Sequence, residues 1–140
     1  MILVDQIIAR LAEVLGRTPQ VVFAYLFGSC ARGDLGPLSD IDVAVYIDSR
    51  LAVFDYRLQL SEILAHELKT DHIDLVILNK AAPLLKSEVV RHGRVIKESK
   101  QDRVIFEVQA LAEYFDTAYL RQTQRDYLKK QLQQGRVSGQ

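Results

Sequence analysis

Two short segments with strict alternation constrain the fold of this chain most, because each combines an aliphatic strand face with an acidic one. Residues 41–47 and 72–78 follow the period of two that sends successive side chains to opposite faces of a β-strand. Aliphatic residues occupy one face of each segment. The other face carries Asp42, with Asp40 two positions before it, and Asp74 in the second segment. The sheet that contains these strands must therefore have a core side and a side with carboxylates.

Helical and apolar periodicities around these segments predict an α/β domain. Residues 21–27 form a nearly continuous apolar run typical of a buried strand, and residues 94–97 suit a short last strand. The spacing of apolar residues predicts helices over 2–17, 50–68, 83–91 and 102–134. The expected architecture is a small mixed β-sheet flanked by helices, with a long helix at the C-terminus.

The last predicted helix combines an apolar stripe with a basic end. Apolar residues at alternating steps of four and three predict a stripe buried on the core, made of Val104, Val108, Leu111, Phe115 and Ala118. Polar residues occupy the next matching positions, so the stripe ends there. Residues 119–140 contain five basic residues and one acidic residue, which is typical of a solvated helix end or of a surface for an acidic partner.

Composition excludes several classes of protein. The 140-residue chain has 18 Lys and Arg against 18 Asp and Glu, so it lacks a global basic footprint, and we expect no direct nucleic-acid binding. Cys30 is the only cysteine, which excludes an internal disulfide and a zinc site built from several cysteines. No apolar run approaches the ~20 residues of a membrane span, and no signal-peptide pattern begins the chain. We expect one compact cytoplasmic domain.

The acidic residues of the two strands suggest a metal site. If the strands are neighbours, then Asp40, Asp42 and Asp74 converge on one surface of the sheet. Three close carboxylates repel one another and are costly to desolvate unless cations bind beside them. Hard divalent ions with oxygen ligands, Mg²⁺ first, are the natural partners of such a cluster.

A glycine-containing loop between the first two predicted strands suits a phosphate group. Gly28 and Ser29 open this loop; the glycine permits close approach, and backbone N–H groups with the serine hydroxyl can bind phosphate oxygens. Arg32 can reach the same phosphates if residues 30–33 form a helical turn. The loop has neither the Gly-Lys-Ser/Thr ending of a Walker loop nor the Rossmann G-x-G-x-x-G pattern.

The spacing of these residues resembles a known motif. Gly28-Ser29, ten intervening residues and Asp40-Ile41-Asp42 are similar to the G-S-x(10)-D-x-D pattern of the DNA polymerase β-like nucleotidyltransferase superfamily. The stretch Phe27-Gly-Ser-Cys-Ala-Arg-Gly-Asp, continuing to Ser39-Asp-Ile-Asp, resembles the minimal nucleotidyltransferase (MNT) branch, which supplies the antitoxin of HEPN/MNT toxin–antitoxin pairs. The resemblance covers roughly residues 20–98.

The resemblance implies a division of the chain. Residues 1–98 would form the nucleotidyltransferase core, and residues 99–134 a C-terminal helix that packs on the core and is a candidate for docking a partner. Residues 135–140 are expected to be a disordered tail.

The resemblance also implies a role for each residue of the motif. Gly28 and Ser29 would hold the β- and γ-phosphates of ATP. Asp40 and Asp42 would bind two Mg²⁺ ions, and Asp74 would complete the site and help activate the acceptor hydroxyl. The acceptor would be a tyrosine of a cognate HEPN ribonuclease toxin, so that transfer of AMP neutralises the toxin.

Two other functions stay open at this point. The chain can be a small-molecule nucleotidyltransferase similar to the aminoglycoside-modifying relatives, although those usually add a substrate-binding domain. It can also be an antitoxin that acts by covering its toxin, with no catalysis. Turnover distinguishes an antitoxin that acts by binding from an enzyme, because a binding protein neutralises its partner only one for one.

Overall fold

Four strands form one mixed sheet in the computed structural model, which describes residues 4–33 and 40–138, with side chains up to residue 134. The strands are β1 (Val21–Phe27), β2 (Ile41–Ile47), β3 (Ile73–Ile77) and β4 (Arg94–Lys97), in the order β3-β2-β1-β4. β1 is antiparallel to both β2 and β4, whereas β2 and β3 are parallel. The mixed sheet expected from the sequence is confirmed.

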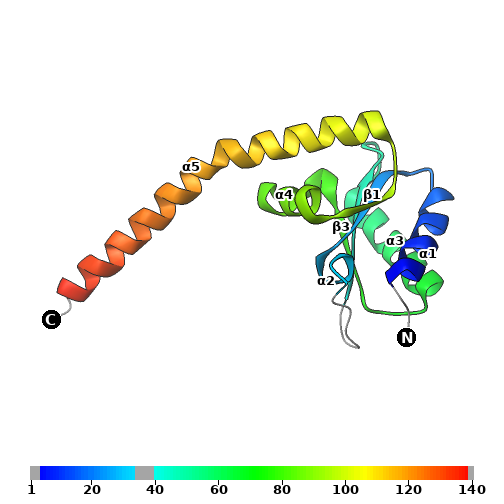
Figure 1. Ribbon diagram of the computed structural model, residues 1–140, viewed down its shortest axis with the longest axis horizontal. Helices are drawn as coiled ribbons and strands as arrows, with labels where there is room; N and C mark the ends of the chain where they lie inside the picture. The colour runs from blue at the N-terminus through cyan, green and yellow to red at the C-terminus, as the bar shows by residue number, and fades with distance from the viewer. Residues whose placement is uncertain (1–3, 34–39, 139–140) are drawn as a thin grey trace.

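Helices cover both faces of this sheet (Figure 1). One face packs against α1 (Val4–Gly16) and α3 (Val53–Leu68), and the other packs against α4 (Pro83–His92) and the first half of α5 (Lys100–Ser138). α3 also supplies the crossover that a parallel connection from β2 to β3 requires. None of the helices within the described residues is long and apolar enough to span a membrane.

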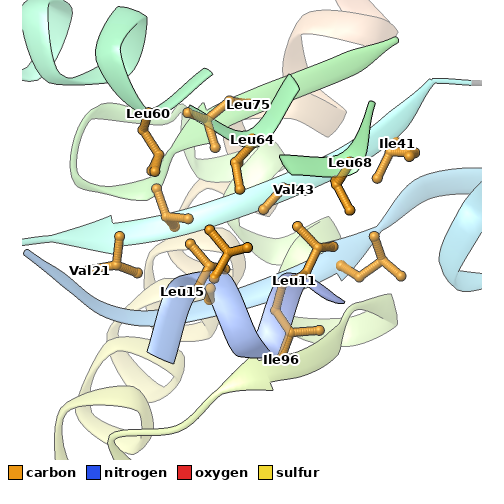
Figure 2. Close-up of a cluster of buried hydrophobic side chains, with 14 of the residues drawn as sticks. Leu11, Leu15, Val21, Ile41, Val43, Leu60, Leu64, Leu68, Leu75 and Ile96 are labelled. Atoms are coloured by element: carbon orange, nitrogen blue, oxygen red, sulfur yellow. The ribbon is translucent and has the colours of Figure 1, made fainter. Parts of the chain in front are cut away.

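The larger core lies between the sheet and helices α1 and α3. Figure 2 shows Leu11 and Leu15 of α1 and Leu64 of α3 directed toward the strands, where they meet Val43 of β2 and Leu75 of β3. The helical spacing of the leucines and the alternation of the strands produce one continuous apolar layer. This layer fixes the sheet and so fixes the positions of the strand ends.

The opposite face of the sheet carries an aromatic core. Phe23 stacks on Tyr46 with ring centroids 5.0 Å apart, and Phe106 of α5 packs against these rings at 5.4 and 5.5 Å. Tyr25 of β1 donates a 2.6 Å hydrogen bond to Glu107 of α5. These contacts anchor the first half of α5 on the strand that leads into the glycine turn.

The predicted stripe of α5 is not buried in the core, so that prediction is wrong. Val104, Val108 and Phe115 are 43, 62 and 67% exposed, and the other two members of the stripe are half-buried. The residues of α5 that enter the core are Phe106 and Ala110, which lie on another face of the helix. An alternating three–four spacing identifies an apolar helix face but not the surface that it meets.

Polar contacts with α4 help to determine how α5 is rotated about its own axis. Lys86 of α4 forms an ion pair with Glu113 of α5 at 3.2 Å. The guanidinium groups of Arg91 and Arg121 lie 4.9 and 4.3 Å from the ring centroid of Tyr114. Such cation–π contacts are attractive; the one from Arg91 holds α5 against α4, whereas the one from Arg121 lies within α5.

Local hydrogen bonds explain where some elements differ from the predicted boundaries. α3 begins at Val53 rather than residue 50, because the Asp48 carboxylate accepts hydrogen bonds from the backbone and side chain of Arg50 and stabilises a turn.

Two short helical pieces follow strands directly, α2 (Gly28–Ala31) and the 3₁₀ turn η1 (Leu78–Lys80).

The end of α5 also differs from the sequence-based expectation. Helix α5 passes the predicted end at residue 134 and continues to Ser138. The last two residues of the expected disordered tail, 139–140, lie outside the described residues.

Substitution of a core leucine tests the packing of α3. We expect Leu64→Ala to lower the free energy of unfolding by about 2–5 kcal/mol, because Leu64 is fully buried and leaves a cavity. Leu58→Ala on the same helix is the matched control; Leu58 is 48% exposed and its loss should cost less than about 1 kcal/mol. Urea unfolding of both variants measures the difference, and equal losses would contradict the assigned face of α3.

Candidate functional site

The glycine turn and two of the acidic residues meet at one end of the sheet. β1 ends at Phe27, which is paired in register with Asp42 of β2, and Asp42 is in turn paired with Asp74 of β3. Helix α2 begins at Gly28, immediately after β1. Three segments that are distant in the sequence therefore meet within the width of three adjacent strands.

Gly28 lies directly against the carboxylate of Asp42. Its φ is +71°, and a Cβ atom placed on it would lie 2.1 Å from Oδ2 of Asp42. A residue with a side chain would therefore be strained by its backbone and would displace the carboxylate. Only glycine allows the turn and the carboxylate to adopt this close arrangement.

The surroundings of Asp42 disfavour the ionised form of its carboxyl group. Its pKa lies above the ordinary value because the group is half-buried and because Asp74 and Asp40 bring negative charge close to it. The guanidinium of Arg32, at the end of α2, acts in the opposite direction. Arg32 thus lies within electrostatic range of Asp42, on the side of the site formed by the glycine turn.

Asp40 and Asp74 are exposed, and Asp40 lies beside a histidine. Oδ1 of Asp40 is 3.6 Å from Nδ1 of His72, the residue just before β3, and the backbone of Ile41 donates a 2.8 Å hydrogen bond to the carbonyl of His72. The motif identified in the sequence does not include His72. Its proximity to Asp40 follows from the parallel pairing of β2 and β3, which the sequence leaves open.

The carboxylate oxygens of the three aspartates are suitable ligands for a divalent cation, although they do not surround a common point. In the part of the chain that the structure describes, no three His, Cys, Asp or Glu side chains form a group that could hold a metal ion as they stand. Repulsion keeps like charges apart, and Asp40 lies beside His72. However, the carboxylates of Asp42 and Asp74 lie on neighbouring strands, and burial together with the charges of Asp74 and Asp40 raises the pKa of Asp42, so negative charge is in surplus here. A cation would relieve that surplus.

Ser29 and Cys30 continue the turn into α2. Ser29 is half-buried next to the site, whereas Cys30 is fully buried within the core cluster under α1. Burial and the charge of Asp42 raise the pKa of the Cys30 thiol, and Arg94 at the start of β4 acts against them. Cys30 is therefore a packing residue. Arg94 adds positive charge near α2 that the sequence analysis did not identify.

Comparison with known proteins identifies relatives of this arrangement. The family described as "Polymerase beta, Nucleotidyltransferase" matches residues 9–102, which include all of the site. A curated relative is the protein adenylyltransferase MntA of Shewanella oneidensis, which is 35% identical over 96 residues, 69% of this chain and 68% of the relative.

Solved structures extend the similarity beyond the core. A toxin–antitoxin crystal structure with AMP-PNP aligns with a TM-score of 0.75 and 31% identity, over 87% of this chain and 98% of the other. A complex of a tri-AMPylated HEPN toxin with an MNT antitoxin from Shewanella oneidensis aligns with a TM-score of 0.71 and 28% identity, over 90% of this chain and 98% of the other.

Replacement of Gly28 tests its close approach to Asp42. We expect Gly33→Ala to cost about 1–2 kcal/mol of unfolding free energy, because Gly33 also has a positive φ, but among the described residues no atom beyond its chain neighbours lies within 4 Å of the added Cβ. Gly28→Ala should cost a further 1–3 kcal/mol or so, because Asp42 must also move. Urea unfolding measures both variants, and equal losses would argue against the contact.

The pKa of Asp42 predicts a pH-dependent effect on stability. Because the folded-state pKa lies above that of the unfolded chain, the ionised carboxyl costs stability at neutral pH, and this cost fades as pH falls through the folded-state pKa. Asp42→Asn should therefore raise the thermal midpoint at pH 7 in metal-free buffer, and the gain should shrink toward pH 4. Asp116→Asn, at an exposed position of α5, is the control. A stabilisation that grew with acidity would be inconsistent with this assignment.

Proposed function

This chain belongs to the polymerase beta nucleotidyltransferase family, and on that premise we propose that it transfers AMP from ATP to a tyrosine hydroxyl of a cognate HEPN ribonuclease toxin. The observation that carries the proposal is the contact of the Gly28 turn with the Asp42 carboxylate, next to Asp74. A phosphate-binding turn against a pair of carboxylates suits a metal-bound triphosphate. The adenylyltransferase and AMPylated-toxin descriptions of the relatives support a protein acceptor.

The glycine turn would position the nucleotide. Backbone N–H groups at Gly28 and Ser29, together with the Ser29 hydroxyl, would donate to the β- and γ-phosphates, because the glycine leaves room for their approach. Arg32, within electrostatic range of Asp42, would add a positive charge on the phosphate side. This binding holds pyrophosphate as the leaving group and aligns the α-phosphate with the acceptor.

The carboxylates would supply the metal ligands and a proton acceptor. Asp40, Asp42 and Asp74 would hold two Mg²⁺ ions, which lower the pKa of the acceptor hydroxyl and neutralise charge at the α-phosphate when bound. The tyrosine oxygen forms a bond to the α-phosphorus while the bond to the β-phosphate oxygen breaks. The exposed carboxylate of Asp74, next to Asp42, would receive the hydroxyl proton, and pyrophosphate leaves.

Addition of AMP explains neutralisation of a ribonuclease in physical terms. The new group is bulky and anionic, so at an RNA-cleaving site it excludes substrate by volume and repels the phosphate backbone of RNA. Because each antitoxin molecule can modify many toxin molecules, neutralisation should be catalytic and should not require a stable one-to-one complex.

Intact-protein mass spectrometry tests the transfer. We expect incubation of this chain with Mg²⁺, ATP and the product of the adjacent reading frame to add whole AMP units to that partner. Asp40→Asn/Asp42→Asn should lower the rate at least about 100-fold, because the ligands of the cation are lost. Asp55→Asn/Asp116→Asn removes two exposed carboxylates from α3 and α5 and should leave the rate unchanged.

Other results of the same experiment would assign another function. Inhibition of an unmodified partner in a tight complex would identify an antitoxin that acts by binding. An unmodified and uninhibited partner, together with AMP transfer to an aminocyclitol, would identify a small-molecule nucleotidyltransferase. Full activity of Asp40→Asn/Asp42→Asn would exclude the proposed carboxylate site.

A further inference from the structure

The second half of α5 leaves the domain as an extended arm (Figure 1). Leu120, Tyr127, Leu128 and Leu132 on this arm are 59, 61, 60 and 68% exposed. Side-chain hydrogen bonds of the arm join residues of the same helix, as between Gln122 and Asp126 or Gln131 and Tyr127. The arm therefore carries four large apolar side chains that are exposed to solvent.

The arm is amphipathic. The four apolar residues, which we call the arm face, follow the spacing i, i+7, i+8 and i+12, so at 3.6 residues per turn they share one side of the helix. Basic residues flank this face: Lys129 and Lys130 lie about 60° beyond its two edges and Arg125 lies beside Leu132, and all three are exposed. An apolar face with charged flanks is typical of a helix that lays its apolar side into a groove of another protein.

The arm face is distinct from the exposed stripe on the first half of α5. The helix turns by about 100° per residue, so Val108 and Phe115 lie on a different side of the helix from Leu128 and Leu132. The stripe is backed by the aromatic core and α4, whereas the arm face has no such support.

Charge favours an acidic partner over a second copy of this chain. Residues 120–134 contain four basic residues and one acidic residue, so two arms side by side would repel each other. Gln124 and Gln131 lie among the apolar residues of the arm face, and insertion into lipid would desolvate their amides. A protein groove can satisfy these amides with hydrogen bonds, and acidic residues at its rim would meet the basic residues that flank the arm face.

We propose that residues 120–132 of α5 form a docking helix that places the arm face in an apolar, acid-rimmed groove of the protein that receives AMP. The identity of that protein rests on the proposed function, whereas the docking surface rests on the exposure and charge of α5. Docking and chemistry thus involve separate parts of the chain, and binding should occur without nucleotide.

Titration calorimetry with the product of the adjacent reading frame, in the absence of ATP and Mg²⁺, tests the docking helix. We expect Leu128→Gln/Leu132→Gln to raise the Kd at least about tenfold, because apolar contacts at the centre of an interface dominate affinity. Val108→Gln/Phe115→Gln is the matched control; it removes two exposed apolar side chains from the same helix and should change the Kd less than about threefold. Circular dichroism verifies that both variants are folded.

A second variant tests the charge argument. Lys129→Glu/Lys130→Glu should slow association about tenfold at low salt, and the difference should fade at high salt as the charges are screened. An unchanged Kd in Leu128→Gln/Leu132→Gln would overturn the proposal. It would also be overturned if light scattering gave a dimer of this chain that the variant abolished, or if the variant abolished binding to anionic phospholipid vesicles.

The outcome for docking is separable from the outcome for catalysis. Arm-dependent binding without any AMP transfer by the wild-type chain would support the docking helix and refute the proposed function. AMP transfer with wild-type affinity in Leu128→Gln/Leu132→Gln would support the function and refute the docking helix.

Discussion

The contact between Gly28 and the Asp42 carboxylate is the constraint on which the rest of the site depends. It requires β1 to end opposite the start of β2, so that the turn after β1 lies against the first acidic position of β2. On the other side of β2, the parallel partner β3 brings Asp74 next to Asp42. The leucine core beneath the sheet and the aromatic core above it hold these strands, and so keep a costly concentration of negative charge in place.

Local periodicity was sufficient to predict the strands but not the relations between distant elements. Strands 21–27, 41–47 and 94–97 match the structure because alternation and apolar runs determine them locally. The proximity of His72 to Asp40 and of Arg94 to α2 depends on strand pairing, which no local pattern encodes. The stripe from Val104 to Ala118 was misassigned for a related reason: Phe106 and Ala110, rather than the most regular apolar face, meet the aromatic core.

The candidate site was more predictable than the surface that surrounds it. Gly28, Ser29, Asp40 and Asp42 fall within a single motif, and their spacing reflects a turn and a strand that must meet. Arg32 depended on the assumption of a helical turn, which α2 supplies. In contrast, α5 is held by an ion pair, one cation–π contact and one tyrosine hydrogen bond, whose partners are distant in the sequence.

The length of α5 sets the separation between the sheet and the far end of the arm. From Phe106, where the helix is fixed to the sheet, to Leu132 the helix rises about 1.5 Å per residue, or about 39 Å in all. A protein held at the far end of the arm would have to extend from there to the end of the sheet to bring a hydroxyl to the carboxylates. The distance between the docking groove and the acceptor tyrosine of the partner would then determine which tyrosine is modified. A tyrosine in a suitable local sequence but at the wrong distance from the groove would not arrive at the nucleotide.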